Sequence, residues 1–157
     1  MKQLLGETLR SAIIDKKNSF DLYSCAAELV SDSQIREIFV YLAQSTAQEL
    51  ERFLSIYPGD EFGEFSALLT CPSSMASPVR RGLLMNNADS IATKDVLGLL
   101  LREEGAFFLR YSAMVESIRE PLLNKLFLQL LGNTTQRCRL IRAECLRIKG
   151  NDSMTPQ

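Results

Sequence analysis

The sequence predicts an all-α fold, a four-helix bundle in which two helical hairpins are joined by a long crossover. Three observations predict it. Apolar residues recur at steps of three and four along two long stretches, as they do on one face of a helix. The two stretches repeat each other in sequence. Between them lies a segment, residues 58–91, that is rich in turn-forming residues and long enough to travel the length of a bundle.

The first hairpin is predicted from two helices of similar length. One spans about residues 2–30 and the other about residues 34–57, with a Ser-Asp-Ser turn at 31–33 that supplies an N-cap. A Pro-Gly pair at 58–59 ends the second helix. The expected apolar faces are Leu5, Leu9, Ile13, Phe20, Tyr23, Ala27 and Val30 in the first helix, and Ile35, Ile38, Phe39, Leu42, Phe53 and Ile56 in the second.

The second hairpin follows the irregular segment, in which we expect only one short helix at about residues 78–85. A long helix then begins with Thr93 as its N-cap. A fourth helix carries Pro121 in its first turn and ends at Gly150. The expected apolar faces are Leu97, Leu101, Phe108, Tyr111, Val115 and Ile118, and then Leu123, Leu126, Phe127, Leu130, Ile141, Cys145 and Ile148.

Length and composition bound the function. The 157 residues suit one domain over 1–150, followed by a flexible tail over 151–157. The net charge of -1 provides no overall field for nucleic acid or an anionic membrane, so neither is expected as a partner. No histidine is present, which excludes Ser-His and Cys-His catalytic arrangements and every metal site that uses histidine.

Cysteine spacing and hydropathy bear on metal and redox sites, on membrane spans and on the cellular compartment. The four cysteines form no Cys-x-x-Cys pair, so zinc-ribbon, rubredoxin-type and thioredoxin-type sites are not expected. No apolar run reaches the roughly 18 residues of a membrane span. We therefore expect a cytoplasmic protein that crosses no membrane.

An offset of 88 residues, the separation of Tyr23 and Tyr111, aligns the two hairpins without gaps. The chain is therefore interpreted as a tandem pair of hairpins. The identical pairs at this offset include Phe20 and Phe108, Tyr23 and Tyr111, Ser24 and Ser112, Glu28 and Glu116, Phe39 and Phe127, Leu42 and Leu130, Thr46 and Thr134, and Gln48 and Gln136.

Polar residues interrupt the apolar faces halfway along each helix. They match one another across the offset of 88, so we expect them to form one layer at the middle of the bundle. We call them the six mid-helix polar positions. They are Lys16, Thr46, Glu49, Glu104, Thr134 and Arg137.

The charges at these positions predict two salt bridges. Lys16 and Glu49 are nearly equidistant from the turn of the first hairpin, and Glu104 and Arg137 from the turn of the second. A buried charge without a partner costs several kcal/mol, so pairing within each hairpin is expected.

The Tyr-bearing first helix, the Phe-Val-Tyr-Leu-Ala run at 39–43 and the doubled hairpin resemble the rubrerythrin branch of the ferritin-like superfamily. The resemblance covers about residues 13–53 and 101–141. It implies the ferritin-like four-helix topology. It also implies two irons that react with peroxide or oxygen, held by a Glu from the first helix of each hairpin and a Glu-x-x-His from the second.

The chain departs from that ligand set. The family's first-helix Glu positions hold Lys16 and Glu104, and its Glu-x-x-His positions hold Thr and Glu in one hairpin and Thr and Arg in the other. Only Glu104 is a residue of the type that the family places at the corresponding ligand position. Two carboxylates and two cations do not hold a pair of irons, so the sequence predicts that salt bridges replace the metal and that no cofactor is bound.

Three functions remain open at this point. The first is a non-catalytic interaction or scaffold protein, expected to be a homodimer because the family often dimerises, with a further protein partner unknown. The second is a rubrerythrin-type iron-binding oxidoreductase that uses Glu104, Glu49, Glu103 or Asp15 as donors. The third is a small-molecule pocket in the core beside Met114 and the tyrosines.

Overall fold

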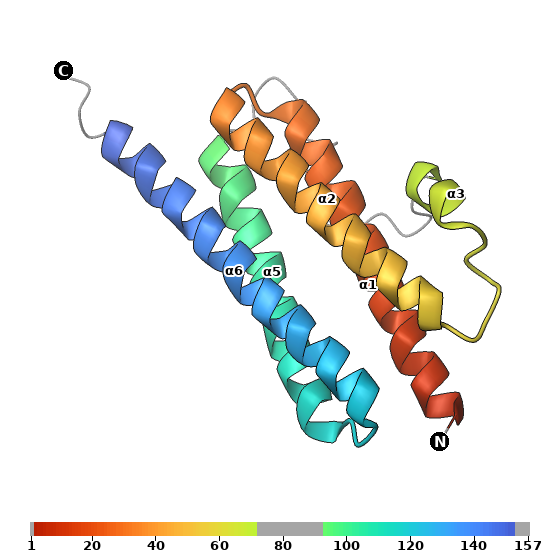
Figure 1. The fold of residues 1–157 in the computed structure, drawn as a ribbon. Coiled ribbons are helices and arrows are strands. Elements are labelled where there is room, and N and C mark those ends of the chain that lie inside the picture. Colours follow the sequence, from red (N-terminus) through yellow and green to blue (C-terminus); the bar gives the residue numbers. More distant parts are fainter. Residues whose placement is uncertain (1, 72–92, 153–157) are drawn as a thin grey trace. The chain divides into compact units, whose positions relative to one another are not determined.

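The computed structural model describes residues 2–71 and 93–152, and all regular structure within these ranges is helical (Figure 1). The all-α prediction is confirmed. The helices are α1 (Lys2–Leu29), α2 (Ser33–Ile56), α3 (Phe65–Thr70), α5 (Thr93–Ser117) and α6 (Pro121–Asp152).

The chain divides into two compact units, Met1–Ser90 and Ile91–Gln157. In the first, α1 and α2 pack along each other as an antiparallel hairpin, and α3 contacts both (Figure 1). In the second, α5 and α6 form the other antiparallel hairpin. Among the described helices, none combines the length and the apolar composition that a bilayer span requires.

The turn of the first hairpin is held by side chains on both sides of it. The Asp32 carboxylate accepts a hydrogen bond of 3.1 Å from Ile35 N and caps the exposed amides of α2. Arg36 Nη2 donates to Val30 O at 2.8 Å, close to the end of α1. Local capping chemistry therefore explains why α1 ends, and α2 begins, within one residue of the predicted positions.

The turn of the second hairpin uses the same kind of chemistry. Pro121 is the first residue of α6, as predicted, where its missing N–H costs nothing. The Glu120 carboxylate accepts from the backbone N–H groups of Leu122 and Leu123. Asn124 Nδ2 reaches back to Val115 O at 2.7 Å and ties the start of α6 to the end of α5.

The helices differ from the sequence prediction at the end of α6 and in the segment after α2. The end of the fourth helix at Gly150 is wrong, because α6 continues through Gly150 to Asp152. Glycine weakens a helix by about 1 kcal/mol relative to alanine but does not have to end it. The segment after α2 contains α3, a helix too short for periodicity to reveal. Thr93, expected as the N-cap, is the first residue of α5. The short helix expected at 78–85 lies outside the described residues.

The buried face of α5 agrees with the predicted one at Leu97 and Tyr111 and differs by one residue at two positions between them. Phe108 was expected inside, but it is 37% exposed, whereas Phe107 is 7% exposed and stacks on Tyr111 at 5.9 Å between ring centroids. Leu100, rather than Leu101, is fully buried. Ile56, at the end of α2, is also exposed. Other apolar residues flank the buried positions, so the apolar face predicted from the sequence is wider than the face that is buried.

The buried positions of the two hairpins follow the offset of 88 found in the sequence. In α1 and α5 the matched buried residues are Leu9 and Leu97, Ala12 and Leu100, Lys16 and Glu104, Ser19 and Phe107, and Tyr23 and Tyr111. In α2 and α6 they include Ile35 and Leu123, Phe39 and Phe127, Leu42 and Leu130, Thr46 and Thr134, Glu49 and Arg137, and Phe53 and Ile141.

Candidate functional site

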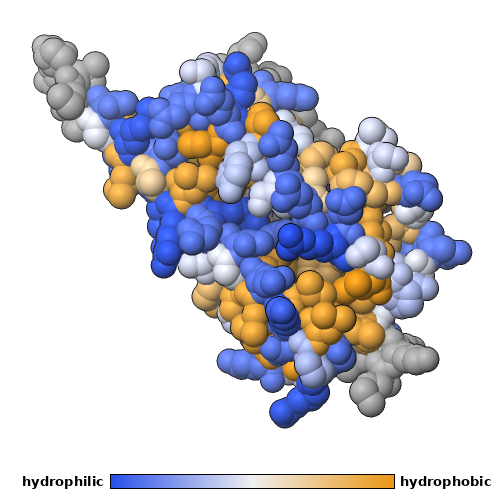
Figure 2. Space-filling model, viewed as in Figure 1, coloured by the Kyte–Doolittle hydropathy of each residue, from blue (hydrophilic) through white to orange (hydrophobic). Residues whose placement is uncertain are grey.

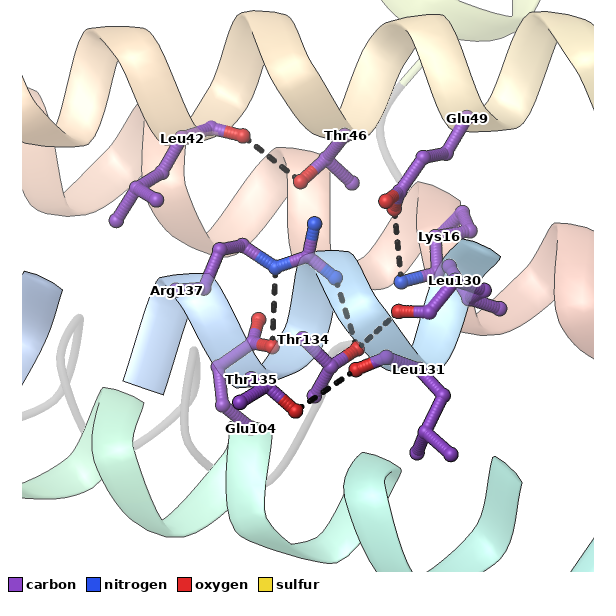
Figure 3. Close-up of polar contacts among 10 residues, drawn as sticks. All are labelled: Lys16, Leu42, Thr46, Glu49, Glu104, Leu130, Leu131, Thr134, Thr135 and Arg137. Atoms are coloured by element: carbon purple, nitrogen blue, oxygen red, sulfur yellow. Dashed lines mark hydrogen bonds and ion pairs between the residues drawn. The ribbon is translucent and has the colours of Figure 1, made fainter. Parts of the chain in front are cut away.

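The first hairpin contains a buried ion pair between its two helices. Lys16 Nζ, from the middle of α1, lies 3.1 Å from Glu49 Oε2 of α2 (Figure 3). The two side chains are only 1% and 7% exposed. Each helix places its charged residue on the same face as its buried apolar residues, such as Ile13 and Phe53. The pair expected from the sequence is therefore present.

The second hairpin contains the other expected pair. Arg137 Nε of α6 donates a hydrogen bond of 3.0 Å to Glu104 Oε2 of α5 (Figure 3). The same guanidinium donates through Nη2 to Thr134 Oγ1 at 3.1 Å. The Arg137 and Glu104 side chains are 3% and 1% exposed. An arginine fork can thus bind a carboxylate and a hydroxyl simultaneously, which a lysine ammonium does with less directional control.

The two buried threonines bind to their own helices. Thr46 Oγ1 donates to Leu42 O at 2.8 Å, and Thr134 Oγ1 donates to Leu130 O at 2.9 Å (Figure 3). Each bond runs to the carbonyl four residues earlier, a common way for a helical threonine to satisfy its hydroxyl. Thr134 also accepts from Arg137, so it links the helix backbone to the ion pair.

Buried aromatic rings and a buried thiol lie in the same hairpin as the pair of Arg137 and Glu104. Tyr111 is fully buried, and its ring packs edge-to-face against Phe127 at 5.9 Å between centroids. Cys138 follows Arg137 in α6 and is also buried. Burial raises the pKa of the Cys138 thiol above its usual 9.0, and the negative charge of Glu104 raises it further. The pKa of the Cys138 thiol therefore depends on the charge of Glu104.

Several buried polar side chains were not anticipated from the sequence. Lys17 is nearly buried, with Nζ 2.6 Å from Asp21 Oδ1 and 3.3 Å from the carbonyl oxygen of Leu69 at the end of α3. Its spacing to Asp21, four residues along a helix, is the signal that could have revealed the ion pair. Glu144 is 7% exposed, and its Oε2 lies 2.7 Å from Arg147 Nε.

Ser19 is a further unexpected buried polar residue. It corresponds to Phe107 at the offset of 88 and is 3% exposed. Among the described residues, no hydrogen-bond partner lies within reach of its hydroxyl. The first hairpin thus places a small polar side chain where the second places a stacked aromatic ring. No sequence signal distinguishes such a serine from an exposed one.

The side chains at the six mid-helix polar positions do not fit a centre of two irons. The only carboxylates there are Glu49 and Glu104, and each is paired with a cation of its own hairpin. Glu103 and Asp15, the other donors considered, are half-buried. Within the described part of the chain, no group of three or more His, Cys, Asp or Glu side chains is placed to hold a metal ion.

The site and the fold together define an all-helical protein with two neutralised ion pairs inside its hairpins. Comparison of the chain with protein-family models, with curated proteins and with solved structures gives no match. The chemistry of the six mid-helix polar positions is therefore the basis on which a function can be argued.

Proposed function

We propose that this chain is a rubrerythrin-like, ferritin-like four-helix bundle in which two salt bridges stand where the family binds two irons. In this proposal it acts as a non-catalytic interaction or scaffold protein and forms a homodimer. The observation that carries the proposal is the pairing of Lys16 with Glu49 and of Arg137 with Glu104 at positions where the resemblance places metal ligands.

Charge balance supports this reading. A diiron site surrounds its metals with carboxylates, whose negative charge the metal ions balance. Here each carboxylate is balanced by a protein cation within 3.1 Å in one hairpin and 3.0 Å in the other. A further cation bound at these carboxylates would have to displace Lys16 or Arg137 and leave that side chain's charge buried without a partner, which is strongly unfavourable.

The lengths of the elements support the bundle arrangement. Helix α2 has 24 residues, which corresponds to about 36 Å. The connection from the end of α2 to the start of α5 is long enough to return along that distance, so α5 can run parallel to α2. Such a connection between two antiparallel hairpins defines the ferritin-like topology.

The surface supports an interaction role. Figure 2 shows apolar residues exposed between hydrophilic ones on the visible face. Large hydrophobic side chains of the described helices remain exposed, among them Tyr41, Leu109, Leu122, Leu128 and Leu146. In this proposal these side chains are the candidates for an interface, because contiguous exposed apolar surface marks interaction sites whereas single exposed leucines do not.

Metal analysis tests the loss of the diiron centre. The full chain is purified from cells grown with added iron, and its iron, manganese and zinc are measured by elemental analysis. We expect far less than one metal ion per chain and no peroxidase or ferroxidase activity. About two metal ions per chain would overturn the proposal and support the oxidoreductase alternative.

The interaction role needs a separate measurement. Light scattering coupled to size-exclusion chromatography gives the mass of the assembly in solution. We expect twice the mass of one 157-residue chain. Substitution of Leu109 or Leu122 by a polar residue then tests whether an exposed leucine contributes to the dimer interface. A monomer at all accessible concentrations would remove the homodimer from the proposal.

A further inference from the structure

The segment that follows α2 turns back along one side of α1 (Figure 1). We call residues 57–71, which include α3, the strap. Near its start, Glu61 Oε1 lies 2.8 Å from Arg10 Nε. Near its end, the carbonyl oxygen of Leu69 lies 3.3 Å from Lys17 Nζ. Because Arg10 and Lys17 are about two helical turns apart on the same face of α1, the strap runs parallel to that helix and is joined to it at two points.

The first of these two contacts lies in solvent. The side chains of Arg10 and Glu61 are 54% and 43% exposed, and an ion pair at such a surface contributes little to stability. Tyr57 Oη also donates to Glu61 Oε1, at 2.6 Å, within the strap itself. The attachment of the strap to α1 therefore depends mainly on the second contact and on the packing of α3.

The second contact caps the C-terminal end of α3. The last four carbonyl groups of a helix have no partner inside it, and the helix dipole favours a cation at that end. Lys17 Nζ donates to one of these carbonyls, that of Leu69. Asp21 Oδ1 holds the same ammonium at 2.6 Å, and the side chains of Lys17 and Asp21 are only 8% and 10% exposed. Helix α1 thus supplies the C-terminal cap of α3.

Helix α3 has little to stabilise it apart from α1 and α2. It has 6 residues, whereas isolated helices shorter than about 12–15 residues are marginal in water. Its N-cap residue, Glu64, makes no side-chain capping hydrogen bond. None of its residues is buried, and its large apolar side chains, Phe65, Leu68 and Leu69, are only half-buried. Elements with few buried apolar contacts open most easily, so α3 should be helical only while it is docked.

We propose that the strap is a conformational switch that opens from α1 as a whole while the α1–α2 hairpin stays folded, with the Lys17 ammonium as its latch. Opening unfolds α3 and removes Leu69 from Lys17, whose Nζ lies 5.6 Å from the centroid of the Phe20 ring. A cationic and aromatic part of α1 then becomes accessible. The proposal uses contacts of the first unit alone and is independent of the proposed function, so neither metal analysis nor the mass of the assembly tests it.

Native-state hydrogen exchange of the full chain tests whether the strap opens separately. Leu68 N donates to Glu64 O at 2.9 Å, and its amide reports on α3. The amide of Cys71, bonded to Ala67 O at 3.0 Å, is a second reporter, and Phe39 in the buried face of α2 reports on the hairpin. We expect protection at least about a hundredfold lower in α3 than at Phe39, and unaffected by low urea, because local opening exposes little surface. Equal protection with the same urea dependence would overturn the switch.

The variant Lys17→Met tests the latch, since it removes the ammonium but keeps a long apolar side chain. We expect the amides of Leu68 and Cys71 to exchange about tenfold faster, while that of Phe39 is unchanged. The control Lys125→Met makes the same substitution at an exposed lysine of α6 and should change none of the three amides. Unchanged exchange in α3, or equal acceleration at Phe39, would overturn the latch. If Lys17→Met does not fold, the exchange of the parent chain decides whether the strap opens by itself.

Discussion

Arg137 Nε donates a hydrogen bond of 3.0 Å to Glu104 Oε2, and both side chains are almost fully buried between α5 and α6. Replacement of Glu104 by Gln leaves the guanidinium of Arg137 buried without its counter-charge. We expect this single change to destabilise the chain by about 3–5 kcal/mol. Urea unfolding followed by circular dichroism measures the change.

The double variant Glu104→Met with Arg137→Leu is the control for that prediction. It removes both charges and fills the space with apolar side chains, so we expect a loss much smaller than the sum of the two single losses. If the loss of stability in the double variant equals the sum of the two single losses, the two residues do not interact energetically.

Ser19 and Thr46 offer a comparison of two buried hydroxyls. Ser19 has no hydrogen-bond partner among the described residues, whereas Thr46 Oγ1 donates to Leu42 O. Ser19→Ala should therefore leave stability unchanged or raise it by about 1 kcal/mol, because it removes a polar group that gains nothing in the core. Thr46→Val should lower stability by a similar amount. Thermal unfolding of both variants checks the contrast, and equal losses would contradict it.

Cys138 should be a slow nucleophile at neutral pH. Its raised pKa, caused first by burial and then by Glu104, means that little thiolate is present near pH 8. We expect iodoacetamide to modify the exposed Cys71 far faster than Cys138. In Glu104→Gln the pKa of Cys138 should fall, because a negative neighbour is lost. The pH dependence of alkylation, read by mass spectrometry of each cysteine, tests both statements.

The same raised pKa gives a direction for stability against pH. A thiol whose folded pKa lies above its unfolded value stabilises the folded state fully below about pH 9, and this contribution is lost as pH rises through the folded pKa. Unfolding midpoints measured from pH 8 upward should therefore decline more steeply in the parent chain than in Cys138→Ala. If the unfolding midpoints of the two chains decline equally with pH, the pKa of Cys138 is not raised in the folded state.

Glu61 gives a prediction at the opposite end of the pH scale. Tyr57 Oη and Arg10 Nε both donate to Glu61 Oε1, at 2.6 Å and 2.8 Å. The hydrogen bond from Tyr57 and then the charge of Arg10 lower the pKa of Glu61 below 4.5. Tyr57→Phe should raise that pKa toward its usual value. Carboxyl carbon shifts followed by NMR during an acid titration measure it.

The lowered pKa of Glu61 fixes the direction in which stability changes with pH at this exposed site. A carboxyl with a lowered folded pKa stabilises the fold above its unfolded pKa and loses that contribution as pH falls through the folded pKa. Because the group lies in solvent, we expect a small effect. A Glu61 pKa that does not respond to Tyr57→Phe would show that the hydrogen bond is absent in solution.

Local chemistry explains which parts of the fold could be predicted. The helix starts at α2 and α6 follow from Asp32 and Pro121, whose capping and backbone preferences act over a few residues. The two ion pairs follow from charged residues that sit on apolar faces at equal distances from a short turn. Both features need only the geometry of one hairpin.

The errors have one local cause and one long-range cause. Phe107 and Phe108 are adjacent aromatic residues, so periodicity alone cannot decide which one packs inside. Lys17 resembles a surface lysine in sequence, and its burial also depends on its contact with Leu69 of α3, which lies 52 residues further along the chain. The pairing of the two hairpins with each other stays a prediction, since it depends on contacts over the longest sequence separations in the chain.

Neutralisation of the buried carboxylates by protein cations bears on how the stability of the fold depends on the supply of metal ions. A protein whose buried carboxylates require a bound metal gains stability in proportion to the logarithm of the free metal concentration, so its folded fraction varies with nutrient supply. Lys16 and Arg137 are encoded in the chain itself and are present at a fixed ratio to Glu49 and Glu104. In the proposed function, the contribution of the two pairs to folding is therefore independent of the free iron concentration.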